Sequence, residues 1–510
     1  MEKSPGLVED IHSSNSQMGS EKGSAPAAYP EHAVDASGQP VYDDAEVRRI
    51  RRKIDWRLLP MLTFLYLASF VDRSNIGNAA IAGMNEDLAL TGGQYNLALT
   101  LFFIPYVIFE VPANIVLKHM RPSWWIGIIT TAWGLVVTFQ GFVTTHEELY
   151  AVRFILGIAE AGFFPAAAFL LTIWYCRFEI QTRFGIFYLA TSSAGAFSGL
   201  LAYGLQFMDG LGGKAGWRWI FIIEGIITVV AGVAVPFVLP DSPDRVKWLT
   251  PAEKELLQNR LSQDSGTAAG KVAVQEKFHW GALKDAMLDW KIWFAILIFW
   301  GTTVPTYAFA FTAPKIVADL GYTAANAQLL VVPIYVLAAI TTLVATRMSD
   351  HYRIRWPFIV FPYCFAVIGF VGLLAIPHPK LPGLTYAFLF FIPGGCYPGV
   401  ITMVGWLGAN LAPTSKRAIG IALGISLANA GGLVGSNIYL EQEAPRYWLG
   451  YGFSLACVCT GIVATLALRF FYKSANDKRD RMSEAEIRAK YTEDELLLLG
   501  DKSPLYRYVL

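Results

Sequence analysis

The stretch "SFVDRSNIGNA", residues 69–79, places an aspartate and an arginine inside a hydrophobic segment. The apolar run "LLPMLTFLYLASF" leads into it, and no turn signal separates the two. A helix needs about twenty mostly apolar residues to cross the ~30 Å hydrocarbon layer of a bilayer. The segment therefore predicts a membrane-spanning helix that carries Asp72 and Arg73 at membrane depth.

The whole composition agrees with a membrane protein. Of 510 residues, 54% are hydrophobic and only 16% are charged, whereas a soluble domain of this size needs more polar surface. We expect an all-α polytopic membrane protein with twelve transmembrane helices. The predicted spans are residues 58–82, 96–118, 123–143, 149–173, 183–207, 218–239, 290–313, 327–347, 357–377, 383–408, 416–439 and 449–471.

Several classes of protein are disfavoured. A net charge of +1 provides no basic face for a nucleic acid. The five cysteines and seven histidines do not cluster at the spacing of metal ligands. We therefore expect no metal, no cofactor and no enzymatic activity. The expected partners are the lipid bilayer and a small solute, and we expect a monomer.

Lysines and arginines gather on alternate connections between the predicted spans. The opposite connections, such as "GMNEDLALTGGQ" and "TTHEEL", contain neither residue. Because basic loops stay on the cytoplasmic side, both termini are predicted to be cytoplasmic, as an even number of spans requires. The expected location is the plasma membrane. The acidic dileucine pattern "EDELL" in the C-terminal tail keeps the vacuolar membrane open as an alternative.

The chain is predicted to have five parts. Residues 1–50 form a disordered cytoplasmic tail, because they are rich in Ser, Gly, Pro and Ala without periodicity. Two six-helix bundles, 51–239 and 289–472, flank a cytoplasmic loop, 240–288, and a second tail, 473–510, follows. In the loop, "LTPAEKELLQNRL" predicts a surface helix capped by Thr250.

The two halves resemble each other. "IDWRLLPMLTFLY" opens the first predicted span and "LDWKIWFAILIFW" opens the seventh. Aligning Asp55 with Asp289 places Asp72–Arg73 opposite Thr306–Tyr307. Two parallel six-helix repeats around a midplane cavity are typical of secondary transporters. The pattern therefore favours an alternating-access carrier.

A charge at membrane depth costs roughly 2.5–3.5 kcal/mol on insertion scales, so each one needs a reason. The fourth span, "AVRFILGIAEAGFFP", contains Arg153 and Glu160, which lie seven residues apart and share a face of the helix. We expect the first and fourth helices to face each other across the cavity, so that these residues form one cluster with Asp72 and Arg73. The alternative is that the charges are salt bridges that only hold helices together.

The types of charge indicate what such a cluster would bind. An arginine holds a carboxylate bidentately and keeps its own charge, whereas a buried carboxylate can take up a proton. An anion that occupies an arginine weakens its hold on a nearby acid, so anion and proton help each other bind. The predicted proton-coupling residues are Asp72 and Glu160. The predicted substrate-binding residues are Arg73, Arg153, Tyr307 and Asn429, with Thr302 and Thr303 as further polar contacts.

Two further acids lie within predicted spans. Glu110 precedes Pro112 by two residues, where the missing backbone donor loosens the helix. A gating or packing role is as consistent with it as a role in proton coupling. Glu224, in "WRWIFIIEG", is expected to pair near the outer surface with Arg218 or with a backbone group.

Four motifs together carry a family resemblance: "FVDRSNIGNA", "RFILGIAEAGFFP", "GWRWIFIIEG" and "LPDSP". Over residues 55–472 the chain resembles the anion:cation symporters of the major facilitator superfamily. The ending "LGDKSPLYRYVL" resembles the fungal branch, which includes allantoate, nicotinate and pantothenate permeases. The resemblance implies an inward and an outward state. It also implies proton-driven uptake of organic anions, with proton sites at Asp72 and Glu160 and anion contacts at Arg73 and Arg153.

One loop departs from the superfamily pattern. The connection "LKHMRPSWW" keeps only Lys118 and Arg121 as permanent basic residues and has no acid. Its counterpart "MSDHYRIR" keeps Asp350, Arg353 and Arg355. We therefore expect the cytoplasmic gating salt bridges to depend on the second half.

The leading hypothesis is proton-coupled symport of a small organic anion such as nicotinate, allantoate or pantothenate. The alternative is proton-driven export of a secondary metabolite or drug, which the same fold permits. A third hypothesis is a nutrient sensor that binds without transport. The two arginines expected in the cavity favour an anion over the neutral or cationic molecules typical of drug exporters.

Overall fold

The computed structural model describes residues 43–117, 119–264, 280–377, 380–412, 414–492, 495–496 and 499–510. Residues 1–42 of the predicted disordered tail, Lys118 and most of "EDELL" lie outside these ranges. Residues 44–50, also predicted to be disordered, are part of a helix instead. The chain divides into two units, 1–49 and 50–510. The described part of the first unit starts a helix, where the Ala45 amide donates to Asp43 Oδ1 at 2.9 Å. The second unit contains the remaining helices.

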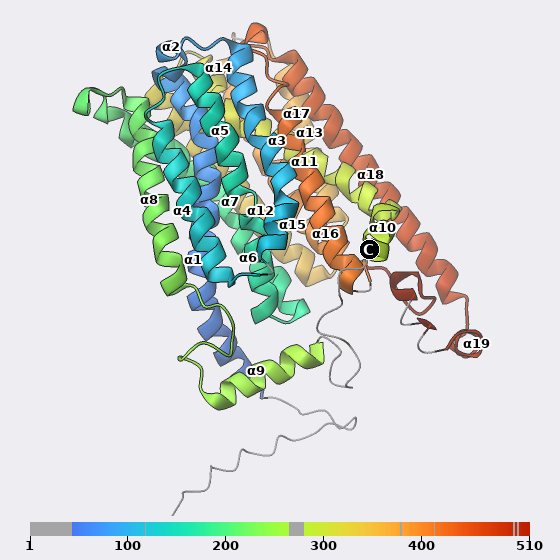
Figure 1. The fold of residues 1–510 in the computed structure, drawn as a ribbon. Coiled ribbons are helices and arrows are strands. Elements are labelled where there is room, and N and C mark those ends of the chain that lie inside the picture. Colours follow the sequence, from blue (N-terminus) through green and yellow to red (C-terminus); the bar gives the residue numbers. More distant parts are fainter. Residues whose placement is uncertain are drawn as a thin grey trace, which may run out of the picture. The chain divides into compact units, whose positions relative to one another are not determined.

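The described residues of the second unit form helices joined by turns and loops (Figure 1). The first half contains α1 (Asp44–Ala79), which begins in the first unit, η1 (Ala80–Met84), α2 (Asn85–Asp87), α3 (Gly92–Leu117), α4 (Pro122–Gln140), α5 (His146–Glu160), α6 (Phe163–Trp174), α7 (Arg177–Leu205), η2 (Gln206–Met208), η3 (Leu211–Gly213) and α8 (Gly216–Val238). The helices α9 (Pro251–Asp264) and α10 (Trp280–Met287) follow. The second half contains α11 (Trp290–Ala318), α12 (Ala324–Tyr352), α13 (Pro357–Ala375), α14 (Pro382–Leu389), α15 (Phe391–Ala409), α16 (Thr414–Asn429), α17 (Gly431–Gly435), η5 (Glu441–Glu443), α18 (Trp448–Asp480), α19 (Glu484–Lys490) and η6 (Gly500–Lys502).

The multi-span helical architecture predicted from the sequence is confirmed. In the described part of the chain, 11 helices are long and apolar enough to cross a membrane. The eleventh predicted span, 416–439, corresponds to α16 and α17, which are interrupted at Ala430. Its apolar part, Ile419–Gly435, is too short to be counted with the others. The first helix begins at Asp44 rather than at 58, because the basic run before the span consists of good helix formers.

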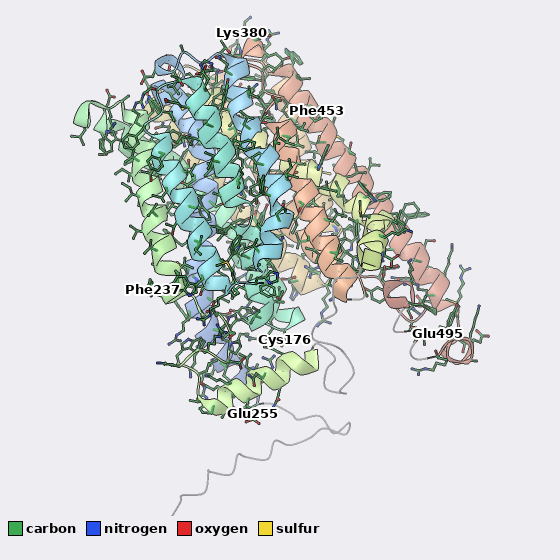
Figure 2. All side chains as sticks on the ribbon, in the orientation of Figure 1. Cys176, Phe237, Glu255, Lys380, Phe453 and Glu495 are labelled. Atoms are coloured by element: carbon green, nitrogen blue, oxygen red, sulfur yellow. The ribbon has the colours of Figure 1, made fainter. Side chains whose placement is uncertain are left out.

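Large apolar side chains cover the outside of the bundle, as a lipid-facing surface requires. Phe237 is 82% exposed and Phe361 69%. Figure 2 labels Phe237 on α8 and Phe453 on α18, and both side chains are exposed. Contiguous exposed apolar surface of this kind is rare on soluble monomers, and the hydrocarbon of a bilayer accounts for it.

Glycines allow a close helix contact in the first half, between α4 and α8. A Cβ at Gly134 would lie 2.7 Å from the Val229 nitrogen, and one at Gly127 would lie 2.8 Å from Pro236 Cδ. In lipid, helices associate through such close backbone approach rather than through the hydrophobic effect. The run of small residues on α4 therefore fixes α8 against the rest of the bundle.

The two halves meet at one end of the bundle. Figure 1 shows α2 and α14 at the end opposite α9, and we name these the α2 end and the α9 end. At the α2 end, Asn437 Nδ2 donates to Thr100 Oγ1 at 2.7 Å. The Tyr95 hydroxyl donates to the Phe311 carbonyl at 3.3 Å. These bonds join α3 of the first half to the region after α17 and to α11 of the second.

Equivalent ion pairs occur at the start of the two predicted repeats. Arg183 Nη2 lies 2.8 Å from Asp55 Oδ2, and Lys416 Nζ lies 2.6 Å from Asp289 Oδ2. Asp55 and Asp289 are the positions aligned between the repeats, and Arg183 and Lys416 lie on the fifth predicted span of each half. The division into two six-helix repeats remains a prediction, which this parallel favours.

The predicted surface helix is confirmed as α9. The Glu253 amide donates to Thr250 Oγ1 at 3.3 Å, and the Thr250 amide donates to Glu253 Oε2 at 3.0 Å. This reciprocal capping box satisfies two amides that a helix start leaves without partners. Lys53 Nζ, on α1, lies 2.6 Å from Glu253 Oε1 and fastens α9 to the first half.

Gly134→Ala is expected to destabilise the protein by about 1–3 kcal/mol, because the added methyl group forces α4 and α8 apart. The matched control is Gly204→Ala on α7, where a Cβ meets nothing within 4 Å. Thermal unfolding in detergent should show a lower Tm for the first variant and an unchanged or higher Tm for the second. Equal Tm values would contradict the tight contact.

Candidate functional site

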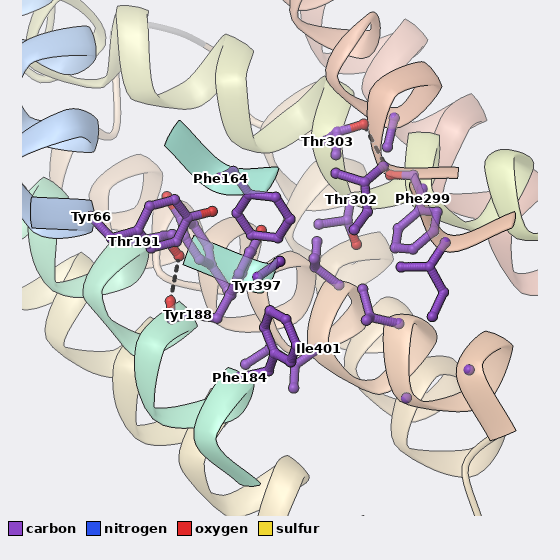
Figure 3. A pocket seen from close by; sticks show the side chains of 18 of the residues that line it. Tyr66, Phe164, Phe184, Tyr188, Thr191, Phe299, Thr302, Thr303, Tyr397 and Ile401 are labelled. Carbon is purple, nitrogen blue, oxygen red and sulfur yellow. Dashed lines mark hydrogen bonds between the residues drawn. The ribbon is translucent and has the colours of Figure 1, made fainter. Parts of the chain in front are cut away.

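A cavity of about 1460 Å³ lies between the two halves within the second unit. Figure 3 shows part of its lining, in which aromatic rings of the first half, such as Tyr188 and Phe164, face Thr302 and Tyr397 of the second. The lining runs from the middle of the helices to Leu261 of α9 and to the loop after α12. The cavity therefore reaches the α9 end, whereas the α2 end is held together by the bonds described above.

The charged residues of the lining are predominantly cationic. Among the described residues that line the cavity, five are arginines and one is an acid. They are Arg73, Arg353, Arg355, Arg417, Arg507 and Asp350. Since the rest of the lining is aromatic, aliphatic or neutral polar, the cavity carries a positive field that attracts anions.

Arg73 forms a buried ion pair with Glu160. Arg73 Nη2 lies 2.8 Å from Glu160 Oε1, and Arg73 Nε donates to the same oxygen at 2.8 Å. The Ser69 hydroxyl also donates to this oxygen. The second carboxylate oxygen, Oε2, has no hydrogen-bond partner among the described residues. The pair joins α1 to α5, so the two predicted residues meet directly rather than across the cavity.

The free edge of Arg73 connects the first half to the second. Arg73 Nη1 donates to the Tyr307 hydroxyl at 3.2 Å, and this hydroxyl donates to Asn429 Oδ1 at 3.1 Å. The guanidinium carbon lies 4.7 Å from the centre of the Tyr106 ring and 5.0 Å from that of Phe70. Aromatic faces stabilise a cation in a desolvated place. Four predicted site residues, Arg73, Glu160, Tyr307 and Asn429, are thus linked in one chain of bonds.

Two of these residues lie where a helix is interrupted. Glu160 is the last residue of α5, and a turn at Ala161–Gly162 separates it from α6. Asn429 is the last residue of α16, before the break at Ala430. Breaks in membrane helices free backbone groups and are common at the binding sites of transporters.

Asp72 does not line the cavity. Successive helix residues point about 100° apart, so Asp72 faces away when Arg73 faces inward. Its Oδ2 accepts from Trp133 Nε1 at 3.1 Å and from the Thr228 hydroxyl at 3.3 Å, on α4 and α8. Its Oδ1 has no partner among the described residues. The expected single cluster of four charges is therefore divided, and Asp72 lies behind the cavity wall.

Arg153 is 1% exposed and lies outside the cavity lining. Its Nε and Nη2 have no hydrogen-bond partner among the described residues. It lies close enough to Tyr95, Glu160 and Asp72 for electrostatic interaction. Arg153 therefore interacts with both acids through space, and two of its donor groups have no partner among the described residues.

The remaining predicted residues occupy different places. Glu110 is buried at 3% exposure and lies next to Ser426 of α16, where the two halves meet. Asp350 Oδ1 lies 2.6 Å from Arg355 Nη1 at the mouth of the cavity. Arg353 also lines the mouth but forms no ion pair with Asp350 among the described contacts.

The expected partner of Glu224 was wrong. Arg218 Nη1 donates to the carbonyls of Gly141 at 3.3 Å and Val143 at 2.6 Å, and not to Glu224. Both Glu224 oxygens are buried without a partner among the described residues. Arg218 lies almost two turns before Glu224, at the start of α8. The carbonyls that it contacts belong to the loop before α5 and lie nearer to it than Glu224 does.

Sequence reasoning missed one part of the cavity. The lining includes Tyr506, Arg507 and Val509 from the C-terminal tail. The tail was expected to be a cytoplasmic extension outside the helical bundles. The signal that could have found it is "LYRYVL", a cluster of aromatic and aliphatic residues in an otherwise polar tail.

Glu224→Gln is expected to leave Tm unchanged or to raise it, because the amide removes a buried carboxylate that has no partner. Arg218→Ala should lower the free energy of unfolding by about 1–3 kcal/mol, since two carbonyls lose their donor. Thermal unfolding of both variants in detergent tests the assignment. An equal loss in both variants would point to an Arg218–Glu224 ion pair instead.

The chain has relatives among fungal proteins. It is 40% identical to the MFS-type transporter cnsO of Penicillium expansum, over 92% of each chain. It is 30% identical to the high-affinity nicotinic acid transporter of Saccharomyces cerevisiae, over 93% of this chain and 87% of that protein. Both similarities extend over nearly the whole membrane region.

Solved structures of other proteins have a fold similar to that of this chain. A bacterial homologue of the human lysosomal transporter Spinster, in an inward-facing and unoccupied conformation, superposes with a TM-score of 0.61 at 16% identity, over 87% of this chain and 100% of that one. The family model that describes the Major Facilitator Superfamily matches residues 62–436. The chain therefore belongs to the Major Facilitator Superfamily of membrane transporters and is not an enzyme.

Proposed function

We propose that this transporter carries a small organic anion by proton-coupled symport and alternating access, as do the anion:cation symporters that its motifs resemble. The observation that carries the proposal is the charge of the cavity: among its described lining residues, five arginines face one aspartate. A cation or a neutral lipophile would gain nothing from this field, whereas a carboxylate would be attracted to it.

Arg73 is the proposed anchor for the substrate carboxylate. It is the charged lining residue in the middle of the helices, and Tyr307 and Asn429 extend its hydrogen bonds into the second half. A guanidinium binds a carboxylate through two parallel bonds. An anion in this position would contact both halves of the protein, as a substrate that controls alternating access must.

The Arg73–Glu160 pair suggests how protons are coupled. A substrate carboxylate that binds Arg73 competes with Glu160 for the same donors. A buried carboxylate that loses its cation is costly, so Glu160 would take up a proton. Anion and proton then bind with positive coupling. Asp72, behind the wall with one oxygen free, is the proposed second proton site.

The proposed membrane is the plasma membrane, with both termini and the α9 end in the cytoplasm. The excess of lysine and arginine on the loops of that end supports this orientation. The cavity reaches the α9 end, so in this orientation the structure would be an inward-open state. The vacuolar membrane is the alternative location.

The similarity to a nicotinic acid transporter supports a carboxylate as the substrate. Nicotinate, allantoate and pantothenate are the proposed compounds to test. Export of a metabolite is the second candidate function. The aromatic part of the cavity lining includes Tyr66, Tyr188 and Tyr397. This lining would suit export of a larger, apolar solute. The direction of transport relative to the proton gradient separates the two.

Uptake of labelled nicotinate, allantoate and pantothenate should be faster at external pH 5 than at pH 7.5 in a host without its own permeases. Arg73→Ala should reduce uptake about 10- to 100-fold, because a charged hydrogen-bond donor is lost. Glu160→Gln and Arg153→Ala should abolish the pH dependence. Accumulation that increases only when cells are de-energised would overturn import in favour of export.

Tyr307→Phe is expected to raise KM about 3- to 10-fold, because it breaks the link between Arg73 and Asn429. The matched control is Tyr106→Phe, which removes a hydroxyl from the same cavity wall without breaking a described hydrogen bond. Its KM should stay within about twofold of the wild type. Equal effects of the two changes would show that the hydroxyl of Tyr307 has no special role.

A further inference from the structure

The C-terminal residues 499–510, here named the terminal segment, lie on the second half of the protein through a buried cluster of charges. Asp501 is 1% exposed and forms ion pairs with Lys291 and Lys416. Lys416 also pairs with Asp289 at 2.6 Å. Burial opposes ionisation of Asp289, but Lys291 and Lys416 outweigh it and hold its pKa below the ordinary value. Asp289 is therefore charged at neutral pH.

A comparison of the two halves explains why the second half needs this segment. Lys291 aligns with Arg57, which is exposed and packs over the Trp248 ring at 4.5 Å. In the second half the corresponding cation is 2% exposed. A buried ammonium without enough negative charge is strongly unfavourable. Asp501 supplies the second acid, so two lysines and two aspartates balance.

Backbone bonds hold the rest of the segment in place. The Val509 amide donates to Asn410 Oδ1 at 2.8 Å, and Asn410 Nδ2 donates to the Val509 carbonyl at 3.0 Å. Trp406 Nε1 donates to the same carbonyl at 2.8 Å. The Tyr508 ring stacks on Tyr472 with centroids 4.6 Å apart. These contacts pack the terminal segment against the second half as an ordered part of the fold.

In this position, the terminal segment places side chains at the mouth of the cavity. Tyr506, Arg507 and Val509 belong to the lining, together with Arg353 and Arg417 of neighbouring elements. Arg507 Nε lies 2.7 Å from Asp480 Oδ1, which fixes its direction. The mouth thus carries more positive than negative charge, and part of that charge comes from the terminal segment.

We propose that the terminal segment is a fixed wall of the transport pathway, and that Arg507 forms with Arg353 and Arg417 a second subsite for the anion at the mouth of the cavity. This inference rests on the proposed anion transport for the identity of the ligand. The seating by Asp501 does not depend on it. A carboxylate that passes between the Arg73 level and the α9 end would meet this subsite first or last.

The packing of the terminal segment against the second half is tested by cysteine labelling. The experiment uses permeabilised membranes and a variant whose five native cysteines are replaced. Ser503→Cys, at a position 5% exposed, should react with a maleimide about a hundredfold more slowly than Lys502→Cys, its exposed neighbour, because reaction requires the buried ion pairs to open. Adding Asp501→Asn, or the milder Asn410→Ala, should accelerate labelling at 503 but not at 502. Equal labelling rates at 502 and 503 without these changes would show that the terminal segment is not packed against the second half.

The subsite is tested by transport kinetics of the full chain. Arg507→Ala should raise the KM for the transported anion about 3- to 10-fold at low salt and less at high salt, with kcat unchanged. Arg507→Lys should retain most of the affinity, and Leu505→Ala, an exposed position outside the lining, should behave as the wild type. An unchanged KM in Arg507→Ala, with Ser503→Cys still protected, would leave a structural wall and overturn the subsite.

The two failures can be told apart. If no anion is transported under any condition, the labelling still decides whether the segment is seated. If Arg507→Ala accelerates labelling at 503, its effect on KM comes from a loosened segment and the subsite is overturned. Anion transport that responds to Arg73→Ala but not to Arg507→Ala keeps the proposed function and removes only the subsite.

Discussion

The structure depends on one constraint: a charge inside the membrane region must be balanced by the protein itself. Arg73 and Glu160 meet this constraint directly, at 2.8 Å, and aromatic rings cover the remaining faces of the guanidinium. The pair joins α1 to α5 and also presents one edge to the cavity. Because breaking a buried pair is costly unless each partner is compensated, the proposed symport would require the anion and the proton to bind together.

The same constraint applies at the α9 end, where each half contains an equivalent ion pair. Asp55 with Arg183 and Asp289 with Lys416 occupy corresponding places. Each pair ties the start of a first helix to the start of a fifth. At the position where the first half has the exposed Arg57, the second half has the buried Lys291, and Asp501 balances its charge. This local difference is consistent with the position of the terminal segment against the second half.

The sequence predicted the fold class and the capped loop helix, because hydrophobic length and capping chemistry are local properties. The roles assigned to Arg73, Glu160, Tyr307 and Asn429 remain predictions, although the four residues lie in one chain of bonds. It did not predict that Asp72 and Arg73 would point to different neighbours. Helix periodicity fixes the angle between two side chains, but the packing of other helices decides what each one meets. The surroundings of Glu224 and the position of the terminal segment were not predicted for the same reason, since both are set by tertiary contacts.

The closure of the α2 end has an energetic consequence for the transport cycle. The bonds described between the halves at that end, such as Asn437 to Thr100 and Tyr95 to Phe311, join uncharged groups. A neutral hydrogen bond contributes only about 0.5–1.5 kcal/mol net. Two conformations separated by a few such bonds stay within reach of thermal fluctuation. In the proposed alternating-access cycle, the binding energy of one small solute would then be enough to shift the populations of the two conformations.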